Sequence, residues 1–163
     1  MNIKLLSVEE LIIVQELAFS TWPDTFKEIL SSEQIKYMLE WMYNLKTLRE
    51  QVKSGHQFYV YEDNSIPKGF IGIELNSPAK NQLKIQKLYV LPELQGDGIG
   101  KKLIEKAIQV ANQNGICEIL LNVNRFNKAV GFYKHIGFTV SYEENIDIGN
   151  GYLMEDYVMS LKL

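Results

Sequence analysis

The sequence is poor in cysteine, and it contains no long apolar run. Cys117 is the single cysteine among 163 residues, so no disulfide can form within the chain. Because Cys117 lies in the apolar segment 116–123, we expect a buried strand thiol rather than a nucleophile. No run approaches the roughly 18 apolar residues that span a membrane, and no apolar signal-peptide segment precedes Glu9 and Glu10. The sequence therefore predicts a cytoplasmic protein that does not enter a membrane.

An excess of positive charge is also lacking. The 17 Lys and Arg residues are outnumbered by 20 Asp and Glu residues, which gives a formal net charge of −3. This balance argues against nucleic-acid binding. It is compatible with a cationic substrate but is too small to identify one. The length and the 46% apolar content suit one domain over residues 1–163 with a sizeable core.

Hydrophobic periodicity predicts a mixed order of strands and helices. Strands are expected at 2–6, 56–63, 68–75, 83–91, 116–123, 138–144 and 152–161. Helices are expected at 8–20, 31–42, 98–114 and 126–136, with 45–53 either continuing the second helix or forming a separate one. Pro23 is expected to end the first helix, because proline disfavours helical backbone at the preceding residue, Trp22. The order predicts an α/β (α+β) mixed sheet whose first half is antiparallel, rather than a regular doubly wound fold.

The stretch Leu88–Lys101, LYVLPELQGDGIGK, has the most specific pattern in the chain. The end of an apolar strand is followed by a glycine-rich turn, residues 96–100, and then by helical periodicity. Such a turn presents unpaired backbone N–H groups and the positive end of a helix dipole. Glycine allows the backbone to approach an anion without an intervening Cβ. The stretch therefore predicts a phosphate-binding loop.

Two familiar phosphate-binding loops fit these letters poorly. A Walker loop requires GxxxxGK followed by Ser or Thr, but Gly100 and Lys101 are followed by Lys102, and Gln95 stands at the position of the first glycine. A dinucleotide fingerprint requires GxGxxG in the first strand–helix unit, whereas the spacing here is GxGxG and lies past the middle of the chain. On this stretch alone, a glycine-rich turn without a ligand is a further alternative.

Two signatures follow one another in the second half of the chain, at Gln95–Gly100 and Asn127–Phe138. The first resembles the Q/R-x-x-G-x-G/A loop of the GCN5-related N-acetyltransferase (GNAT) family, which holds the pyrophosphate of acetyl-CoA. The second resembles that family's N-x-x-A-x-x-F-Y-x-x-x-G-F segment. The resemblance covers nearly the whole chain. It implies the family's fold, acetyl-CoA as co-substrate, no metal, and direct transfer without a covalent acyl-enzyme.

The resemblance also implies which residues bind the co-substrate. The loop residues implied to hold the pyrophosphate are Gln95, Gly96, Asp97, Gly98, Ile99, Gly100 and Lys101. In the family the pantetheine arm pairs with the strand before the loop, here Leu88, Tyr89 and Val90, and one N–H there is the oxyanion donor. Asn127 is implied to bind the arm, although it also suits a helix N-cap. Because Asn127 precedes the alanine of the signature by two residues, where three is common, Asn124 is an alternative.

Tyr133 and Glu74 are the candidate catalytic residues. Tyr133 lies where the family commonly places a tyrosine acid near the cofactor sulfur. A phenol, with a pKa of about 10, is protonated at neutral pH and can give its proton to the departing thiolate. A core tyrosine is the alternative. Glu74, at the end of an expected strand, is the candidate base for the amine; a solvated strand residue, with water chains in place of a single base, is the alternative.

The first helical segments are expected to supply the acceptor pocket. Its aromatic and acidic residues suit a cationic amine and are Trp22, Phe26, Tyr37, Asp24, Glu28 and Glu33. A core aromatic set beside a solvated helix face is the alternative. The segments 21–43 and 149–159 are similar to PaiA-type polyamine acetyltransferases. We therefore expect a small-molecule primary amine, and more narrowly a polyamine, as the acceptor. Acetylation of protein N-termini or lysines, and a non-catalytic acyl-CoA-binding regulator, are the alternatives, and exposed apolar strand edges are compatible with a homodimer.

Overall fold

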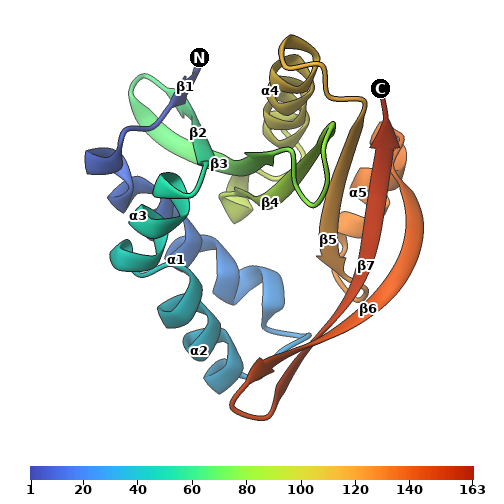
Figure 1. The fold of residues 1–163 in the computed structure, drawn as a ribbon. Helices are drawn as coiled ribbons and strands as arrows, with labels where there is room; N and C mark the ends of the chain where they lie inside the picture. The colour runs from blue at the N-terminus through green and yellow to red at the C-terminus, as the bar shows by residue number, and fades with distance from the viewer.

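A seven-stranded sheet runs through the protein, whose computed structural model describes residues 1–163 (Figure 1). The strands lie in the order β1-β2-β3-β4-β5-β7-β6. Their bounds are β1 (Asn2–Leu5), β2 (His56–Asp63), β3 (Ile66–Leu75), β4 (Gln82–Val90), β5 (Glu118–Asn124), β6 (Thr139–Gly149) and β7 (Tyr152–Lys162). Neighbouring strands are antiparallel except for β4 and β5, which are parallel. The predicted mixed sheet with an antiparallel first half is confirmed.

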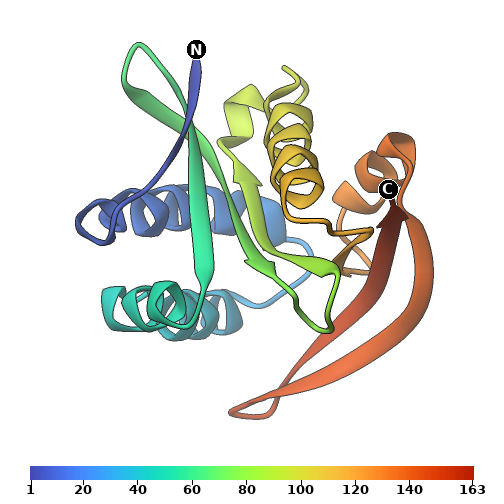
Figure 2. The same cartoon turned by 45° about the horizontal axis from the view of Figure 1, so that its top comes forward.

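Helices cover both faces of this sheet. Their bounds are α1 (Ile12–Phe26), α2 (Ser32–Met42), α3 (Leu45–Lys53), α4 (Ile99–Gln113) and α5 (Ala129–Ile136), with short 3-10 turns η1 (Val8–Glu10) and η2 (Pro92–Leu94). Phe58 and Val60 of β2 pack against α1–α3, whereas Tyr59 and Tyr61 belong to the cluster that contains α4 and α5. Figure 2 shows α1–α3 and α4 on opposite sides of β2–β4. None of the helices has the length and apolar character that crossing a membrane requires.

The prediction that Pro23 ends the first helix is wrong, because α1 continues through Pro23 to Phe26. Proline removes one hydrogen bond from a helix interior. Packing holds the helix on both sides of it: Trp22 is only 1% exposed, and its ring centre lies 4.6 Å from that of Phe26 and 5.6 Å from that of Tyr89. The N–H of Lys27 donates to the carbonyl of Pro23 at 3.0 Å and closes the last turn. Tertiary packing therefore outweighs the local preference.

The segment 45–53 forms the separate helix α3 rather than a continuation of α2. Asn44 separates the two, because its side-chain Oδ1 accepts a hydrogen bond from the N–H of Thr47 at 2.8 Å and caps α3. Both of these helices therefore begin at a capped residue, since the Oγ of Ser31 accepts from the N–H of Gln34 at 3.1 Å at the start of α2.

The expectation of a buried thiol at Cys117 is wrong. Cys117 is exposed and precedes β5, which begins at Glu118. The burial of the apolar run starts one residue earlier, at Ile116, and resumes within β5. The thiol Sγ lies 3.5 Å from the carbonyl oxygen of Asn81 in the turn before β4. Periodicity located the strand but not the residue at which its burial pattern begins.

The β6–β7 hairpin is longer than the sequence pattern predicts, and its tip reaches α2 (Figure 1). The hydroxyl of Tyr37 donates to the carbonyl of Ile148 at 2.9 Å. The side-chain amide of Gln34 donates to the carbonyl of Leu153 at 3.2 Å. These two hydrogen bonds attach the hairpin to α2.

Strands β4 and β5 pair only at their beginnings. Their parallel register joins 82–85 to 118–121 and ends there. At the same point the pairing of β4 with β3 shifts register between Gly72 and Ile73, which places an extra residue, Gln86, on β4. A bulge bends the strand that carries it. Beyond it, β4 follows β3 while β5 follows β7, so the sheet opens into a V between β4 and β5.

Candidate active site

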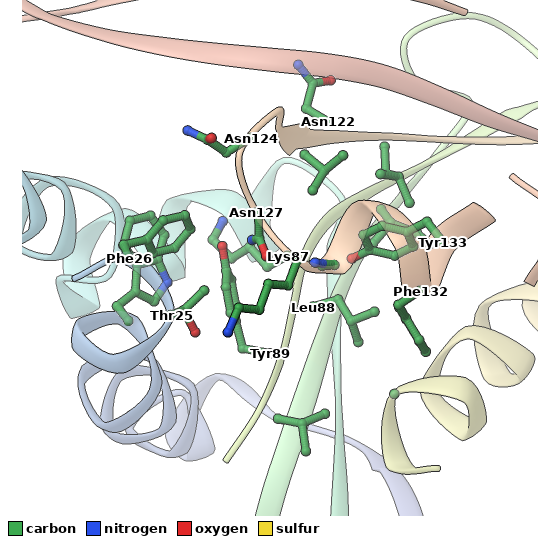
Figure 3. A pocket seen from close by; sticks show the side chains of 18 of the residues that line it. Thr25, Phe26, Lys87, Leu88, Tyr89, Asn122, Asn124, Asn127, Phe132 and Tyr133 are labelled. Carbon is green, nitrogen blue, oxygen red and sulfur yellow. Dashed lines mark hydrogen bonds between the residues drawn. The ribbon is translucent and has the colours of Figure 1, made fainter. Parts of the chain in front are cut away.

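A cavity of about 1270 Å³ occupies the V between β4 and β5. Its walls come from α1 and α2 on one face of the sheet, from α4 and α5 on the other, and from the ends of β6 and β7 (Figure 3). It brings together most of the site residues expected from the sequence, namely Leu88, Tyr89, Val90, Gln95, Gly96, Gly98, Ile99, Gly100, Lys101, Asn127 and Tyr133. Asp97 and Glu74 do not line it.

The glycine-rich loop ends in left-handed backbone at Gly98, with a φ of +80°, immediately before α4. The first N–H that α4 pairs is that of Lys102, which donates to the carbonyl of Gly98 at 3.1 Å. The N–H groups of Ile99, Gly100 and Lys101 precede this bond and have no partner within the helix. All three residues line the cavity, so the loop has the donors that a diphosphate requires.

Two other loop residues contribute differently from what the sequence implied. The N–H of Asp97 donates to the carbonyl of Leu94 at 3.3 Å, so it belongs to the turn itself. The side-chain amide of Gln95 donates to the carbonyl of Val90 at 3.3 Å and ties the loop to the end of β4. Gln95 therefore positions the loop in this structure.

The edge of β4 that faces the V presents backbone groups of Leu88 and Val90. The N–H of Leu91 donates to the carbonyl of Lys68 on β3 at 3.0 Å. Because backbone groups alternate along an antiparallel strand, those of Tyr89 also point toward β3, and those of Leu88 and Val90 point away from it. The N–H groups available to a pantetheine arm or an oxyanion are therefore those of Leu88 and Val90.

Tyr133 extends from α5 toward the centre of the cavity (Figure 3). Its ring is 7% exposed and packs edge-on against Phe132 at 5.3 Å and Phe138 at 5.7 Å between ring centres. Burial raises the pKa of the Tyr133 hydroxyl. The group therefore stays protonated at neutral pH and can donate a hydrogen bond or a proton to an anion in the cavity.

Asn124 and Asn127 both line the cavity, and both use their side-chain oxygens locally. The Oδ1 of Asn124 accepts from the N–H of Phe126 at 3.0 Å, and that of Asn127 accepts from the N–H of Ala129 at 2.9 Å. The sequence offered a helix N-cap as the alternative for Asn127, but α5 begins at Ala129 and Lys128 holds the N-cap position. Neither bond occupies the Nδ2 donors, so the bond from Ala129 and a contact to the pantetheine arm are compatible at Asn127.

Glu74 lies at the end of β3, outside the cavity lining. Its Oε2 accepts a hydrogen bond from the Gln86 side chain at 3.0 Å and lies 3.1 Å from Nε2 of His56. The carboxylate thus ties the bulge residue of β4 to the start of β2. These contacts give Glu74 a structural role, and its role as the direct base stays a prediction.

The α1–α2 wall contains only part of the acceptor pocket that the sequence predicts. Trp22, Phe26, Asp24 and Glu28 line the cavity, together with a further aromatic residue, Trp41. The other two expected residues, Tyr37 and Glu33, lie outside it.

One functional candidate that the sequence analysis did not single out is Asp156 on β7. It lines the cavity, is only 5% exposed, and its Oδ1 has no hydrogen-bond partner. Burial raises the pKa of its carboxyl group, although the hydrogen bond from Asn122 opposes the shift. The alternation of Met154, Asp156 and Val158 along an apolar strand would have flagged it as an inward-facing acid.

A second candidate that the sequence analysis missed is Lys87 on β4. Its Nζ donates to Oε1 of Gln51 at 3.1 Å and lies 5.5 Å from the ring centre of Tyr43 and 5.6 Å from that of Phe58. Burial lowers the pKa of Lys87 from 10.5 to about 8. Strict alternation along β4 would place this lysine on the α4 face, and the bulge at Gln86 moves it to the opposite one.

Comparisons with known proteins agree with this geometry. Residues 26–161 match the acetyltransferase (GNAT) domain family. The chain is 31% identical to a spermidine N(1)-acetyltransferase of Thermoplasma acidophilum over 161 residues, which are 94% of this chain and 95% of the relative. Its fold is similar to the crystal structure of a PaiA N-acetyltransferase from the same organism in complex with coenzyme A, with a TM-score of 0.82, 29% identity and full coverage of both chains. A GCN5-related N-acetyltransferase from Rhodopseudomonas palustris shares the fold with a TM-score of 0.83 at 17% identity, over 99% of this chain and 95% of that one.

The chain therefore belongs to the GNAT acetyltransferase family. It is an acetyl-CoA-dependent N-acetyltransferase, and the fold and enzyme class that the two sequence signatures implied are confirmed.

Proposed function

We propose that the protein moves an acetyl group from acetyl-CoA to a primary amine of a small molecule of the polyamine class, by direct transfer between two molecules bound in one cavity. The observation that carries this proposal is a cavity lined from both faces of the sheet, with the glycine-rich loop on the α4 face and acidic and aromatic side chains on the α1–α2 face. The relative from Thermoplasma acidophilum, whose name gives spermidine as its substrate, supports the acceptor class.

The α4 face fits coenzyme A. The unpaired N–H groups of Ile99, Gly100 and Lys101 suit the diphosphate, and the Lys101 side chain adds positive charge. The free edge of β4 at Leu88 and Val90 suits the amide groups of the pantetheine arm. Asn127 adds an Nδ2 donor from the opposite wall. Binding in this way supports a position of the thioester in the V, between β4 and β5.

Acetyl transfer requires a donor to the carbonyl oxygen, a proton for the departing sulfur and a neutral acceptor nitrogen. The residues described above supply the first two. The N–H of Leu88 or Val90 donates to the carbonyl oxygen as negative charge develops on it. Tyr133 donates a proton to the sulfur as the thiolate departs. Its raised pKa keeps that proton in place at neutral pH until the thiolate forms. The acceptor nitrogen must also lose a proton, because an alkyl ammonium with a pKa of about 10.4 carries no lone pair for attack.

The α1–α2 face fits an amine with a second charge. Trp22 and Phe26 offer aromatic surface for methylene groups and for a cation. Asp24 and Glu28 lie at the rim of the same wall. Lys27 pairs with Asp24 at 3.0 Å, which leaves Glu28 as the rim carboxylate for a second ammonium.

A thiol-release assay with purified protein and acetyl-CoA tests the acceptor class. The panel contains spermidine, shorter diamines, a monoamine of similar length, aminoglycosides, amino acids and short peptides. We expect the highest kcat/KM with the polyamines. Glu28→Gln should raise KM for spermidine several-fold and leave the monoamine unchanged, whereas the control Glu33→Gln, outside the cavity, should change neither. Turnover with peptides alone would keep the enzyme class and move the acceptor to proteins.

A further inference from the structure

Asp156 lines the cavity and has one buried carboxylate oxygen without a hydrogen-bond partner. The residue is 5% exposed, its Oδ1 has no hydrogen-bond partner, and its Oδ2 accepts from Nδ2 of Asn122 at 3.2 Å. A buried carboxylate oxygen without a donor is destabilising unless something binds there. The protein therefore supplies a donor to one oxygen of this group and leaves the other oxygen, at the cavity wall, without one.

The carboxylate is held in place by its neighbours. Asn122 also donates to Oε2 of Glu144 at 3.0 Å, and its Oδ1 accepts from Nζ of Lys84. The amide is therefore oriented with its Nδ2 toward the two carboxylates. Arg125 contacts only the backbone carbonyl of Asp156, at 3.4 Å, and its guanidinium lies near Glu143 and Glu155.

Asp156 and Tyr133 approach the V from opposite faces of the sheet. Leu121 and Val123 of β5 point toward the cluster that contains Tyr133 and α4. Asn124, the next residue in this alternation, points to the other face, and Asp156 shares that face because it lies directly opposite Asn124 in the register of β5 and β7. A group that serves the incoming nitrogen and a group that serves the departing sulfur require such an arrangement.

We propose that Oδ1 of Asp156 binds the ammonium of the acceptor amine and takes up its proton before the nitrogen attacks the thioester. This inference rests on the proposed function and adds the base that deprotonates the acceptor amine. The proton moves from the ammonium to Asp156, and the neutral nitrogen forms a C–N bond to the carbonyl carbon. The C–S bond then breaks as Tyr133 gives its proton to sulfur. The second proton of the nitrogen returns to the tyrosinate, and Asp156 releases its own proton to solvent.

The electrostatics of the site are consistent with this role. Burial raises the pKa of Asp156 and nearby Glu144 adds to the shift, while Asn122, Lys84 and Arg125 oppose it. A carboxylate of raised pKa is a stronger base toward an ammonium than an ordinary one. The hydroxyl of Tyr89 on β4, which also lines the cavity, has a pKa raised mainly by burial and stays neutral.

The test is the pH dependence of kcat/KM with spermidine for the wild type, Asp156→Asn and the control Glu144→Gln. Glu144 accepts from the same Asn122 amide, so the control removes a neighbouring charge of similar position. A bound base gives the wild type a plateau between the pKa of Asp156 and that of the amine. We expect Asp156→Asn to lose about 100-fold at pH 7 and to rise continuously toward the amine pKa, since the amine must then lose its proton in solution. Glu144→Gln should stay within about threefold and keep the plateau.

Calorimetry with acetyl-CoA accompanies the kinetics, and an unchanged affinity shows that Asp156→Asn is folded. A variant within threefold of the wild type, with the same plateau, overturns the role of Asp156 and leaves the proposed function standing. If the wild-type kcat/KM rises with pH without a plateau, the role of Asp156 is also overturned and the proposed function stands. This outcome is informative even if Asp156→Asn does not fold. A wild type that acetylates no amine overturns the proposed function, and this inference with it.

Discussion

Gly98 and Gly115 stand just outside the two ends of α4 with the same left-handed backbone, with φ angles of +80° and +67°. A Cβ added to either would meet no atom within 4 Å. The two positions therefore carry similar backbone strain for any other residue, but only Gly98 lines the cavity. Substitutions at these two positions therefore distinguish phosphate binding by the loop from the effect of backbone strain on stability.

Gly98→Val should weaken acetyl-CoA binding strongly, by about 10-fold or more. Valine at a positive φ costs on the order of 1–2 kcal/mol, and a branched side chain there obstructs the approach to the unpaired N–H groups. Gly115→Val should lower the melting temperature about as much as Gly98→Val does, and it should leave the affinity for acetyl-CoA unchanged. Calorimetry and thermal unfolding of both variants check this expectation. Equal affinities of the two variants for acetyl-CoA would contradict the binding of the diphosphate by this loop.

Tyr133→Phe should lower kcat by about 10²-fold or more while leaving the acetyl-CoA dissociation constant nearly unchanged, because it removes a proton donor and keeps the packed ring. The matched control is Tyr59→Phe, which removes a hydroxyl outside the cavity that donates to Gln57 at 3.1 Å. Steady-state kinetics with a saturating amine measure the effect. A Tyr133→Phe enzyme with full turnover would show that another group protonates the sulfur.

Asn127→Asp should weaken acetyl-CoA binding several-fold, because it keeps the oxygen that accepts from the N–H of Ala129 and loses the Nδ2 donor. Asn124→Asp is the matched control, with its oxygen likewise engaged, by the N–H of Phe126. Asn124 shares a sheet face with the acceptor side of the cavity, so we expect a smaller effect there. Calorimetry of both variants decides, and the opposite order would assign the pantetheine contact to Asn124.

Lys87→Met should stabilise the protein at neutral pH and change how its stability depends on pH. The folded-state pKa of Lys87 lies near 8, below its ordinary value of 10.5, so the unfolded chain binds more protons between these values. The stability of the wild type therefore rises with pH across this window, by at most about 3 kcal/mol. Denaturant unfolding at pH 7 to 10.5 should show this rise in the wild type and lose it in the variant. Parallel curves would contradict the burial of a charged Lys87.

The sequence predicted those parts of the fold and site whose causes are local. The glycine-rich turn before α4 acts through neighbouring backbone groups, and periodicity located every strand. The path of α1 through Pro23 was not predictable in this way, because it depends on the contacts of Trp22 with Tyr89, 67 positions further along the chain.

The bulge at Gln86 is the main feature that the amino-acid sequence alone does not predict. It opens the V and turns Lys87 to the other face of β4, and it depends on the register between β3 and β4. Asp156 was visible as a polar residue at an inward position of β7, but its importance comes from Asn122 on another strand and from a cavity built by segments far apart in the sequence. Glu74 shows the converse, since its position in the sequence suggested a base and its contacts are structural.

Product analysis by mass spectrometry shows directly whether the protein transfers the acetyl group to an amine. The purified protein is incubated with acetyl-CoA and spermidine, and acetylated amine and free thiol are counted in the same sample. We predict one N-acetylspermidine for each thiol released, at a rate that falls sharply in Tyr133→Phe. Tight acetyl-CoA binding without acetylation of spermidine or of any other amine in the panel would contradict it and would indicate an acyl-CoA-binding regulator.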